Sequence, residues 1–244
     1  MAIAFIAAVV GLLALFHTAP FPAAFDASVG DRSVWRMPPS EGAPTIYLTY
    51  DDGPNPVATG ELLDVLAESG ARATFFLIDD HVTDETAPLV RRMFAEGHAV
   101  AVHSDERWLA FKSAEAIAAR ISAAGARIEQ AGGGAPCRAF RPHAGWRSPA
   151  MFHALERLDY RLVGWSWNAW DWNWFRARTA ESIVGRVTSR ASDGLIVVIH
   201  DGHHVDPRPE RRYAIEATRQ IVPALRAKGF AFGTVCGSGK APGF

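Results

Sequence analysis

The chain has 244 residues, of which 49% are hydrophobic and 21% are charged, and this size and composition suit one folded domain with a substantial core. The formal net charge is -1 and Lys and Arg form no basic run, which argues against a nucleic-acid partner. The two cysteines, Cys137 and Cys236, are too few for a disulfide scaffold. They form one bridge in an exported protein or stay two buried thiols.

The N-terminal residues are unusually apolar. Residues 2–16 are an unbroken apolar run without a charge, shorter than the roughly 20 residues that span a membrane. The run is typical of a signal peptide or membrane anchor, with a helix packed on the domain as the alternative. We therefore expect an extracytoplasmic protein that is secreted, periplasmic or anchored through residues 2–16. Residues 1–43 would form this segment and a Pro-rich linker, and residues 44–244 the folded domain.

From residue 45 onward, short apolar runs alternate with longer amphipathic ones, the pattern of a parallel sheet with crossover helices. The expected strands are 45–50, 73–78, 98–103, 137–141, 161–166, 195–200 and 230–235. The expected helices are 58–69, 86–96, 113–130, 149–158, 178–191 and 211–228. Seven such units predict an α/β fold, a (β/α)7 incomplete or distorted TIM-like barrel, rather than an open doubly wound sheet.

Side chains that can take part in catalysis or bind a metal stand at the ends of these expected strands. They are Asp51, Asp52, His103, Arg141, His200 and Asp201. Because the carboxyl ends of barrel strands form one face, we expect these groups to converge there into an active site. Asp51 and Asp52 would point to opposite sides of a continuing strand, but Gly53 and Pro54 predict a turn that brings both to the same site.

The segment Thr49–Pro54 reads T-Y-D-D-G-P and resembles the first motif, T-F-D-D-G-P, of the polysaccharide deacetylases with a NodB homology domain, carbohydrate esterase family 4. The likeness extends over residues 44–235. It implies a NodB-type barrel, with Asp51 as the general base and Asp52 as a ligand of a divalent metal ion, zinc in our expectation.

The second motif of that family, H-[ST]-x-x-H, supplies two more metal ligands, but here it is incomplete. His103 matches the first histidine, while Arg107 stands in place of the second. A guanidinium has no lone pair to donate, and catalytic zinc takes about three protein ligands. Substitute ligands are therefore sought among Asp105, Glu106, His143, His203 and His204. The alternatives are a two-ligand site completed by water, or no metal, with Arg107 paired to Asp52.

The third motif, R-x-P-P-[YFW]-G, is matched in part by residues 141–146. The resemblance implies that Arg141 orients the base and that the backbone N–H of Ala144 stabilises the oxyanion. Trp146, two residues further on, would replace the family's aromatic side chain as a substrate contact.

The fourth and fifth motifs, D-x-x-D-W and L-x-H, are similar to Asn168–Trp172 and Val198–His200. By this resemblance His200 is the general acid, and Asp171 raises its pKa. Three tryptophans past the strand end are expected on the rim, where indoles stack on sugar rings. They are Trp170, Trp172 and Trp174.

The resemblance thus implies a metal-dependent hydrolase that removes acetyl groups from N-acetylated or O-acetylated glycans, such as peptidoglycan or chitin-type oligomers. The metal would polarise the acetyl carbonyl, the base would activate water, and the acid would protonate the leaving nitrogen. Two alternatives stay open. One is a catalytically impaired carbohydrate-binding protein on the same scaffold, motivated by Arg107. The other is a related C–N hydrolase of small amides.

Overall fold

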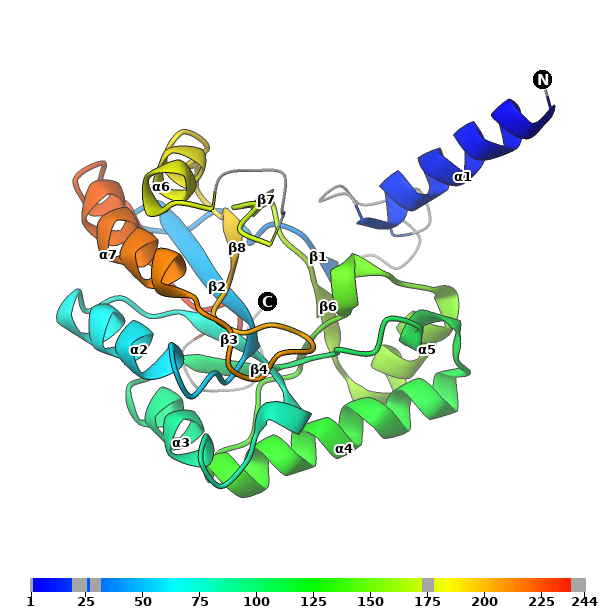
Figure 1. Cartoon of the computed structure of the whole chain (residues 1–244), viewed down its shortest axis with the longest axis horizontal. Helices are drawn as coiled ribbons and strands as arrows, with labels where there is room; N and C mark the ends of the chain where they lie inside the picture. Colours follow the sequence, from blue (N-terminus) through cyan, green and yellow to red (C-terminus); the bar gives the residue numbers. More distant parts are fainter. Residues whose placement is uncertain (1, 19–25, 27–31, 173–177, 238–244) are drawn as a thin grey trace.

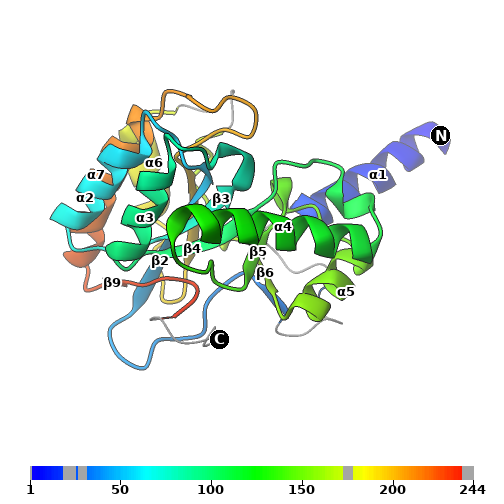
Figure 2. The same ribbon diagram turned by 90° about the horizontal axis from the view of Figure 1, so that it is seen from below.

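The computed structural model describes the chain apart from residues 1, 19–25, 27–31, 173–177 and 238–244. Helix α1 (Ala2–Thr18) projects from the body of the domain (Figure 1, Figure 2), and its residues 2–11 are exposed. Of the helices in the described part of the chain, none is both long and apolar enough to cross a bilayer.

The rest of the chain alternates strands and helices as expected. The strands are β1 (Ser33–Val34), β2 (Thr45–Gly53), β3 (Thr74–Ile78), β4 (Ala99–His103), β5 (Ala139–Arg141), β6 (Arg161–Val163), β7 (Trp167–Asn168), β8 (Ile196–His200) and β9 (Ala231–Phe232). The helices are α2 (Thr59–Glu68), α3 (Ala87–Ala95), α4 (Ala114–Gly132), α5 (Pro149–Leu158), α6 (Ala180–Thr188) and α7 (Arg212–Arg226), with short 3₁₀ turns η3 (Asp79–His81), η4 (Leu109–Phe111) and η5 (His143–Gly145).

The strands form one curled, wholly parallel sheet in the order β1-β6-β5-β4-β3-β2-β8-β7, with β9 added beside the start of β2. Over the described residues β1 and β7 end the sheet without pairing to each other, so the barrel stays open. The helices pack in the row α5-α4-α3-α2-α7-α6 around the outside of the sheet (Figure 1). The expected incomplete (β/α)7 barrel is therefore confirmed.

Local sequence explains these elements. All five side chains of β3, T-F-F-L-I, are buried, as a central strand covered on both faces requires. Helix α4 starts where the Ser113 hydroxyl accepts a hydrogen bond from the Ala116 N–H, and it ends at Gly133, whose φ of 72° only glycine adopts without strain. Helix α5 begins with Pro149, where the missing N–H costs nothing.

Two parts of the fold lie outside the expected elements. The segment expected as a linker contains β1, which pairs with β6, and the side chains of Trp35 and Met37, which belong to the core. The strand expected over 161–166 ends at Val163 as β6, and a separate, unexpected strand, β7, begins at Trp167 and pairs with a different neighbour. Cys137 and Cys236 are joined in a disulfide that links the residues before β5 to those after β9.

A buried ion pair ties the segment that follows α1 to the loop after β5. The Asp26 carboxylate accepts hydrogen bonds of 2.8 Å from Nε of Arg147, and neither residue is more than 2% exposed. The guanidinium also lies 4.7 Å above the ring of Trp35. This contact fixes the loop that begins with η5.

Candidate active site

A cavity of about 570 Å³ opens at the carboxyl ends of the central strands. It is lined by Asp51, Asp52, His103, Arg107, Pro142, His143, Ala144, Trp165, Trp167, Asn168, Trp170, Trp172, Arg178, Val198, His200, His203, His204 and Arg211. Most of the side chains expected at strand ends thus meet in one place. Acids, imidazoles and indoles share the wall of this cavity.

The sheet register brings the charged groups to the same level. Asp51 on β2 lies beside His200 on β8, and His103 on β4 lies beside Arg141 on β5. Because neighbouring parallel strands are about 4.8 Å apart, partners in register present their side chains to the same small volume. Four strands, β2, β4, β5 and β8, therefore bring these groups to one site.

Asp51 is held by a buried guanidinium. Its Oδ1 accepts a 2.6 Å hydrogen bond from Nη1 of Arg141, which is itself fully buried. Arg141 also donates to Thr49 Oγ1 and to the carbonyl oxygens of Val163 and Gly164, and it lies over the ring of Phe76. These contacts fix the guanidinium, which in turn orients the carboxylate of Asp51 in the cavity.

Asp52 lies beside Asp51 because the strand bends at this point. Its φ is 69°, an unusual value for a residue with a side chain, and the register with β3 shifts between Asp51 and Gly53. Such a conformation costs about 1–3 kcal/mol and is typical of functional sites. Because of this bend, the two adjacent acids do not point to opposite sides of the strand, and both carboxylates face the cavity.

His103 presents its second nitrogen to Asp52. Its Nδ1–H donates to the carbonyl oxygen of Arg141 at 2.7 Å, so that Nε2 faces Oδ1 of Asp52 at 3.1 Å. Burial raises the pKa of Asp52, but the hydrogen bond and charge of His103 outweigh it and lower the pKa well below its usual range. Burial alone would lower the pKa of His103, but the negative charges of Asp51 and Asp52 outweigh burial, so the pKa of His103 is raised.

These two groups fit a metal site only in part. A ligating histidine commonly donates its other N–H to a carbonyl, as His103 does, and Asp52 offers a carboxylate oxygen next to it. Over the described residues, however, no three His, Cys, Asp or Glu side chains are placed to hold one ion. Arg107 lines the cavity, but its described contacts include no ion pair with Asp52. Asp52 and His103 are therefore two donors in place, and among the described residues no third His, Cys, Asp or Glu side chain is placed with them.

The expected substitute ligands lie in different places. His143 and His203 line the cavity together with His204, whose ring centroid is 4.9 Å from that of His143 and 4.5 Å from that of His203. Burial and the neighbouring His103 lower the pKa of His143 to about 4, which leaves a neutral imidazole at neutral pH. Asp105 instead pairs with Arg120 of α4, at 3.6 Å.

His200 is a charged imidazole at neutral pH. Its Nδ1–H donates to Oδ1 of Asp171 at 2.9 Å, and its backbone N–H donates to Oδ2 at 2.7 Å. Burial lowers the pKa of His200, but the charge and hydrogen bond of Asp171 outweigh it and raise the pKa to about 9. With this raised pKa, His200 carries a proton on its opposite nitrogen at neutral pH, in the wall of the same cavity as Asp51.

The remaining expected residues are on or near the rim. Ala144, with a φ of 51°, lines the cavity, and so do Trp170 and the half-exposed Trp172, whose rings lie 5.7 Å apart. Trp146 is not in the cavity wall but packs against the core, 6.4 Å from the ring of Phe111. Trp174 lies outside the described residues.

Sequence reasoning assigned no role to Arg178 and Arg211, which both line the cavity. Arg211 is buried and donates to the carbonyl oxygen of Gly202 at 2.8 Å. Neither residue follows an expected strand, so the strand-end signal that found the other groups did not reach them.

Asp201 lies directly behind the bend at Asp52. It is 1% exposed, it accepts a hydrogen bond from Thr59 Oγ1, and its Oδ1 has no hydrogen-bond partner among the described residues. Burial raises the pKa of Asp201 to about 7, aided by the charge of Asp52 and opposed by the hydrogen bond from Thr59. A Cβ added to Gly53 would lie 2.7 Å from Oδ2 of Asp201, so only glycine fits there.

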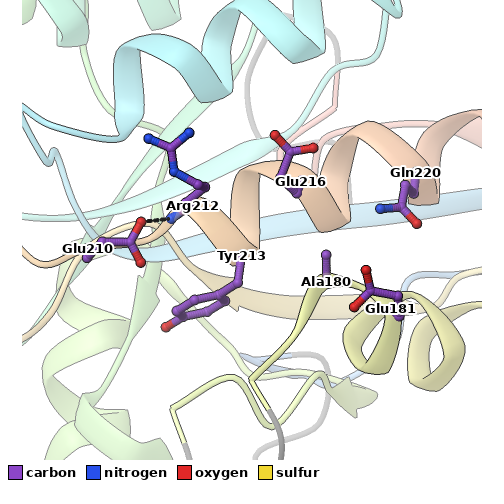
Figure 3. A pocket seen from close by; sticks show the side chains of 7 residues that line it. All are labelled: Ala180, Glu181, Glu210, Arg212, Tyr213, Glu216 and Gln220. Carbon is purple, nitrogen blue, oxygen red and sulfur yellow. Dashed lines mark hydrogen bonds between the residues drawn. The ribbon is translucent and has the colours of Figure 1, made fainter.

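A second hollow of about 530 Å³ lies between α6 and α7 (Figure 3). Its wall holds Glu181, Glu210, Arg212 and Tyr213, and the Arg212 backbone N–H donates to the carboxylate of Glu210. The Tyr213 hydroxyl donates to the backbone carbonyl of Asp171 at 3.3 Å. This hollow therefore adjoins Asp171, the residue that holds His200. Unlike the first cavity, its described wall contains no histidine and no adjacent pair of aspartates.

The fold is an open α/β barrel, and its cavity brings together a carboxylate held by a buried guanidinium and an imidazole held by a second carboxylate. The family model "polysaccharide deacetylase" matches residues 39–163. A chitooligosaccharide deacetylase of Rhizobium leguminosarum bv. trifolii is 37% identical, covering 76% of this chain and 87% of the relative. A peptidoglycan-N-acetylglucosamine deacetylase of Bacillus cereus is 32% identical over 82% of this chain and 90% of the relative.

Solved structures agree. The peptidoglycan deacetylase PdaC of Bacillus subtilis superposes with a TM-score of 0.69 at 28% identity, over 80% of this chain and 90% of that one. A family 4 acetyl xylan esterase of Clostridium thermocellum, in complex with a cobalt ion, gives 0.68 at 33% identity, over 78% and 88%. The chain belongs to the polysaccharide deacetylase family, as the resemblance of its motifs predicts.

Proposed function

We propose that this chain removes acetyl groups from N-acetylated glycans, such as chitooligosaccharides or peptidoglycan strands. The observation that carries the proposal is that two acid–base couples meet at one cavity: Asp51 with Arg141, and His200 with Asp171. Hydrolysis of an amide needs both couples at once, because the attacking water loses a proton while the departing nitrogen gains one.

In the proposed reaction Asp51, oriented by Arg141, accepts the proton of the attacking water. His200 is already protonated and gives its proton to the leaving nitrogen, while Asp171 stabilises the imidazolium. The backbone N–H of Ala144, in the cavity wall, is the proposed donor to the oxyanion. Trp170 and Trp172 are the proposed platform for the sugar ring that carries the acetyl group.

We further propose that a divalent metal ion, zinc in our expectation, binds at Asp52 and His103. Bound there, such an ion would polarise the acetyl carbonyl as a Lewis acid. The third ligand is proposed among His143, His203 and water, because both imidazoles line the same cavity. The metal-bound acetyl xylan esterase named above supports a metal in this family.

The proposed location is outside the cytoplasm, with a cell-wall glycan as the substrate. Two observations support it: the disulfide between Cys137 and Cys236, which persists in oxidising compartments, and the apolar helix α1, which suits an export signal or a membrane anchor. Fractionation of cells that express the full chain tests this location.

Acetate release from chitin oligomers, acetylated peptidoglycan and acetyl-xylan tests the proposed activity. We expect the wild-type protein to release acetate from the N-acetylated substrates and Asp51→Asn to release at least 100-fold less, a loss typical for a general base. Equal circular dichroism spectra of the two proteins would serve as the control for folding. Full activity of Asp51→Asn would refute the mechanism, and a wild type that binds glycan but releases no acetate would point to a binding protein.

A further inference from the structure

Three arginines line the cavity of the proposed active site, and none of them belongs to the two acid–base couples. They are Arg107, which follows β4, Arg178, which precedes α6, and Arg211, which precedes α7. Guanidinium groups stay protonated in proteins, so each of the three carries a positive charge. The same wall contains only two acids, Asp51 and Asp52. The wall therefore holds more guanidinium groups than carboxylates.

The two acids of the wall already have other partners. Asp51 accepts its 2.6 Å hydrogen bond from the fully buried Arg141, and Asp52 lies 3.1 Å from Nε2 of His103. Over the described part of the chain, neither carboxylate forms an ion pair with one of the three wall arginines. The positive charge of these arginines is therefore not neutralised by the acids that share the cavity with them.

Arg107 is exposed at the cavity, and the acids next to it in sequence are engaged elsewhere. Asp105 lies 3.6 Å from Arg120 of α4. Glu106 forms an ion pair with Lys112. No residue that the structure describes forms a hydrogen bond or an ion pair with Arg107. Its guanidinium is thus left to interact with whatever fills the cavity, at the position where the second family motif has a histidine.

Arg211 is buried, at 6% exposure, although its described partners are uncharged. Its Nε donates to the carbonyl oxygen of Gly202 at 2.8 Å, and its Nη1 donates to the hydroxyl of Tyr213. Its Nη2 makes no hydrogen bond to a described residue. Buried charges are normally paired with an opposite charge, because removing an unpaired ion from water is costly. A negatively charged ligand in the cavity would supply such a partner.

Guanidinium groups bind anions in a specific way. Their N–H donors lie in one plane and match the oxygens of a carboxylate or a phosphate group in pairs. Several like charges in a concave site also attract an oppositely charged ligand more strongly than scattered surface charges do. The cavity combines both properties, since three guanidinium groups from three separate loops share its wall.

We propose that the preferred substrate is an N-acetylated glycan whose sugar units carry an anionic group, a carboxylate or a phosphate, and that Arg107 and Arg211 bind this group. The inference rests on the proposed function, because that function makes the occupant of the cavity a saccharide. It narrows the substrate class, since neutral chitin oligomers should then bind more weakly than acidic glycans.

The test measures binding to the full chain by titration calorimetry, with Asp51→Asn in every protein so that no turnover occurs. One ligand is peptidoglycan strands freed of their peptides, with free carboxylates, and the other is the same strands with the carboxylates converted to neutral methyl esters. We expect the free acid to bind about 10- to 100-fold more tightly, the range of a hydrogen bond to a charged group. Arg107→Gln should remove most of this preference and change binding of the ester less than twofold.

Two further variants sharpen the comparison. Arg211→Lys keeps the buried charge but loses the planar donors, and it should lower the preference for the acid about 3- to 10-fold. Arg212→Gln is the matched control, because it removes an exposed arginine next to Arg211 that does not line the cavity, and it should leave the preference unchanged. Equal affinity of the parent protein for acid and ester would overturn the proposal, and so would an equal loss for both ligands in Arg107→Gln.

A third ligand distinguishes the two anionic groups. It is a chitin oligomer that carries phosphate groups, compared with the unmodified oligomer. Tighter binding of the phosphorylated oligomer than of the carboxylated strands would assign phosphate as the group that the arginines bind. If neither anionic ligand binds more tightly than its neutral counterpart, the proposal is overturned.

Acetate release separates this proposal from the proposed function. Protein with intact Asp51 is assayed on the acidic strands and on their methyl esters. A binding preference for the acid without acetate release would support the anion site and refute the proposed activity. Acetate release with no preference between acid and ester would overturn the anion site and leave the activity standing.

Discussion

Replacing Asp171 by Asn tests whether His200 acts as an acid because of its partner. Asn keeps a carbonyl oxygen that can accept from the His200 backbone N–H, but it removes the charge that raises the pKa of His200 to about 9. A pKa of about 9 instead of 6.5 corresponds to about 3 kcal/mol in favour of the imidazolium. With the charge of Asp171 removed, burial still lowers the pKa of His200 and only the smaller effects of Asp51 and Asp52 raise it, so a pKa near the ordinary value of 6.5 is expected.

The consequence for activity follows from the protonated fraction. At pH 7.5 a group with a pKa of 9 is nearly all protonated, whereas at a pKa of 6.5 only about a tenth is, so Asp171→Asn should lose at least about tenfold in kcat. In a pH profile of kcat on a chitin oligomer, the alkaline limb should move from near pH 9 toward pH 6.5. A variant with reduced kcat but an unmoved alkaline limb would refute this role of Asp171.

The free energy of unfolding should also depend on the protonation of His200. Because the folded pKa of His200 is raised, its contribution to the free energy of unfolding is complete below pH 6.5 and is lost as the pH rises through 9. Urea unfolding should therefore show a loss of up to about 3 kcal/mol from pH 6.5 to pH 9.5 that is absent in Asp171→Asn. Equal pH dependence in both proteins would count against the ion pair.

Three further outcomes are expected. His103→Ala should reduce bound divalent metal from about one equivalent to near zero, as measured by elemental analysis. The control His153→Ala, on the exposed side of α5, should leave the metal content unchanged. A wild type without metal would contradict the proposed site. Cys137→Ser should lower the free energy of unfolding by about 2–4 kcal/mol in non-reducing urea titrations, and a wild type unchanged by reductant would argue that no disulfide forms. Gly53→Ala should cost about 1–3 kcal/mol, since its Cβ meets the carboxylate of Asp201, and an unchanged melting temperature would show that this region yields.

Sequence patterns predicted the long elements closely, and for a physical reason. Helix α5 begins and ends at the expected residues 149 and 158, because its proline, its apolar face and its end are all local signals. Strand β1 was missed because two residues carry no periodicity, and its place depends on pairing with β6. Gly164, which separates β6 from β7, is required by the close approach of Trp35, a tertiary contact.

In the site, too, local sequence signals were predictive and tertiary contacts were not. Asp51, His103 and His200 were predicted because they end apolar strands, and the structure brings them to one cavity. The place of His204 against His143 was not predictable, since it depends on how two loops fold toward each other. The roles assigned by resemblance remain predictions until the variants are measured.

The ion pair between Asp26 and Arg147 bears on how this protein should be produced and processed. A cut that leaves Asp26 in place keeps the carboxylate that neutralises a fully buried guanidinium. A cut just after it removes that carboxylate from the loop that carries His143 and Ala144, and loss of one partner of a buried pair costs about 3–5 kcal/mol. The loop that forms part of the cavity wall is thus stabilised by a residue more than a hundred positions earlier in the chain. Removing the N-terminus up to and including Asp26 would destabilise this wall.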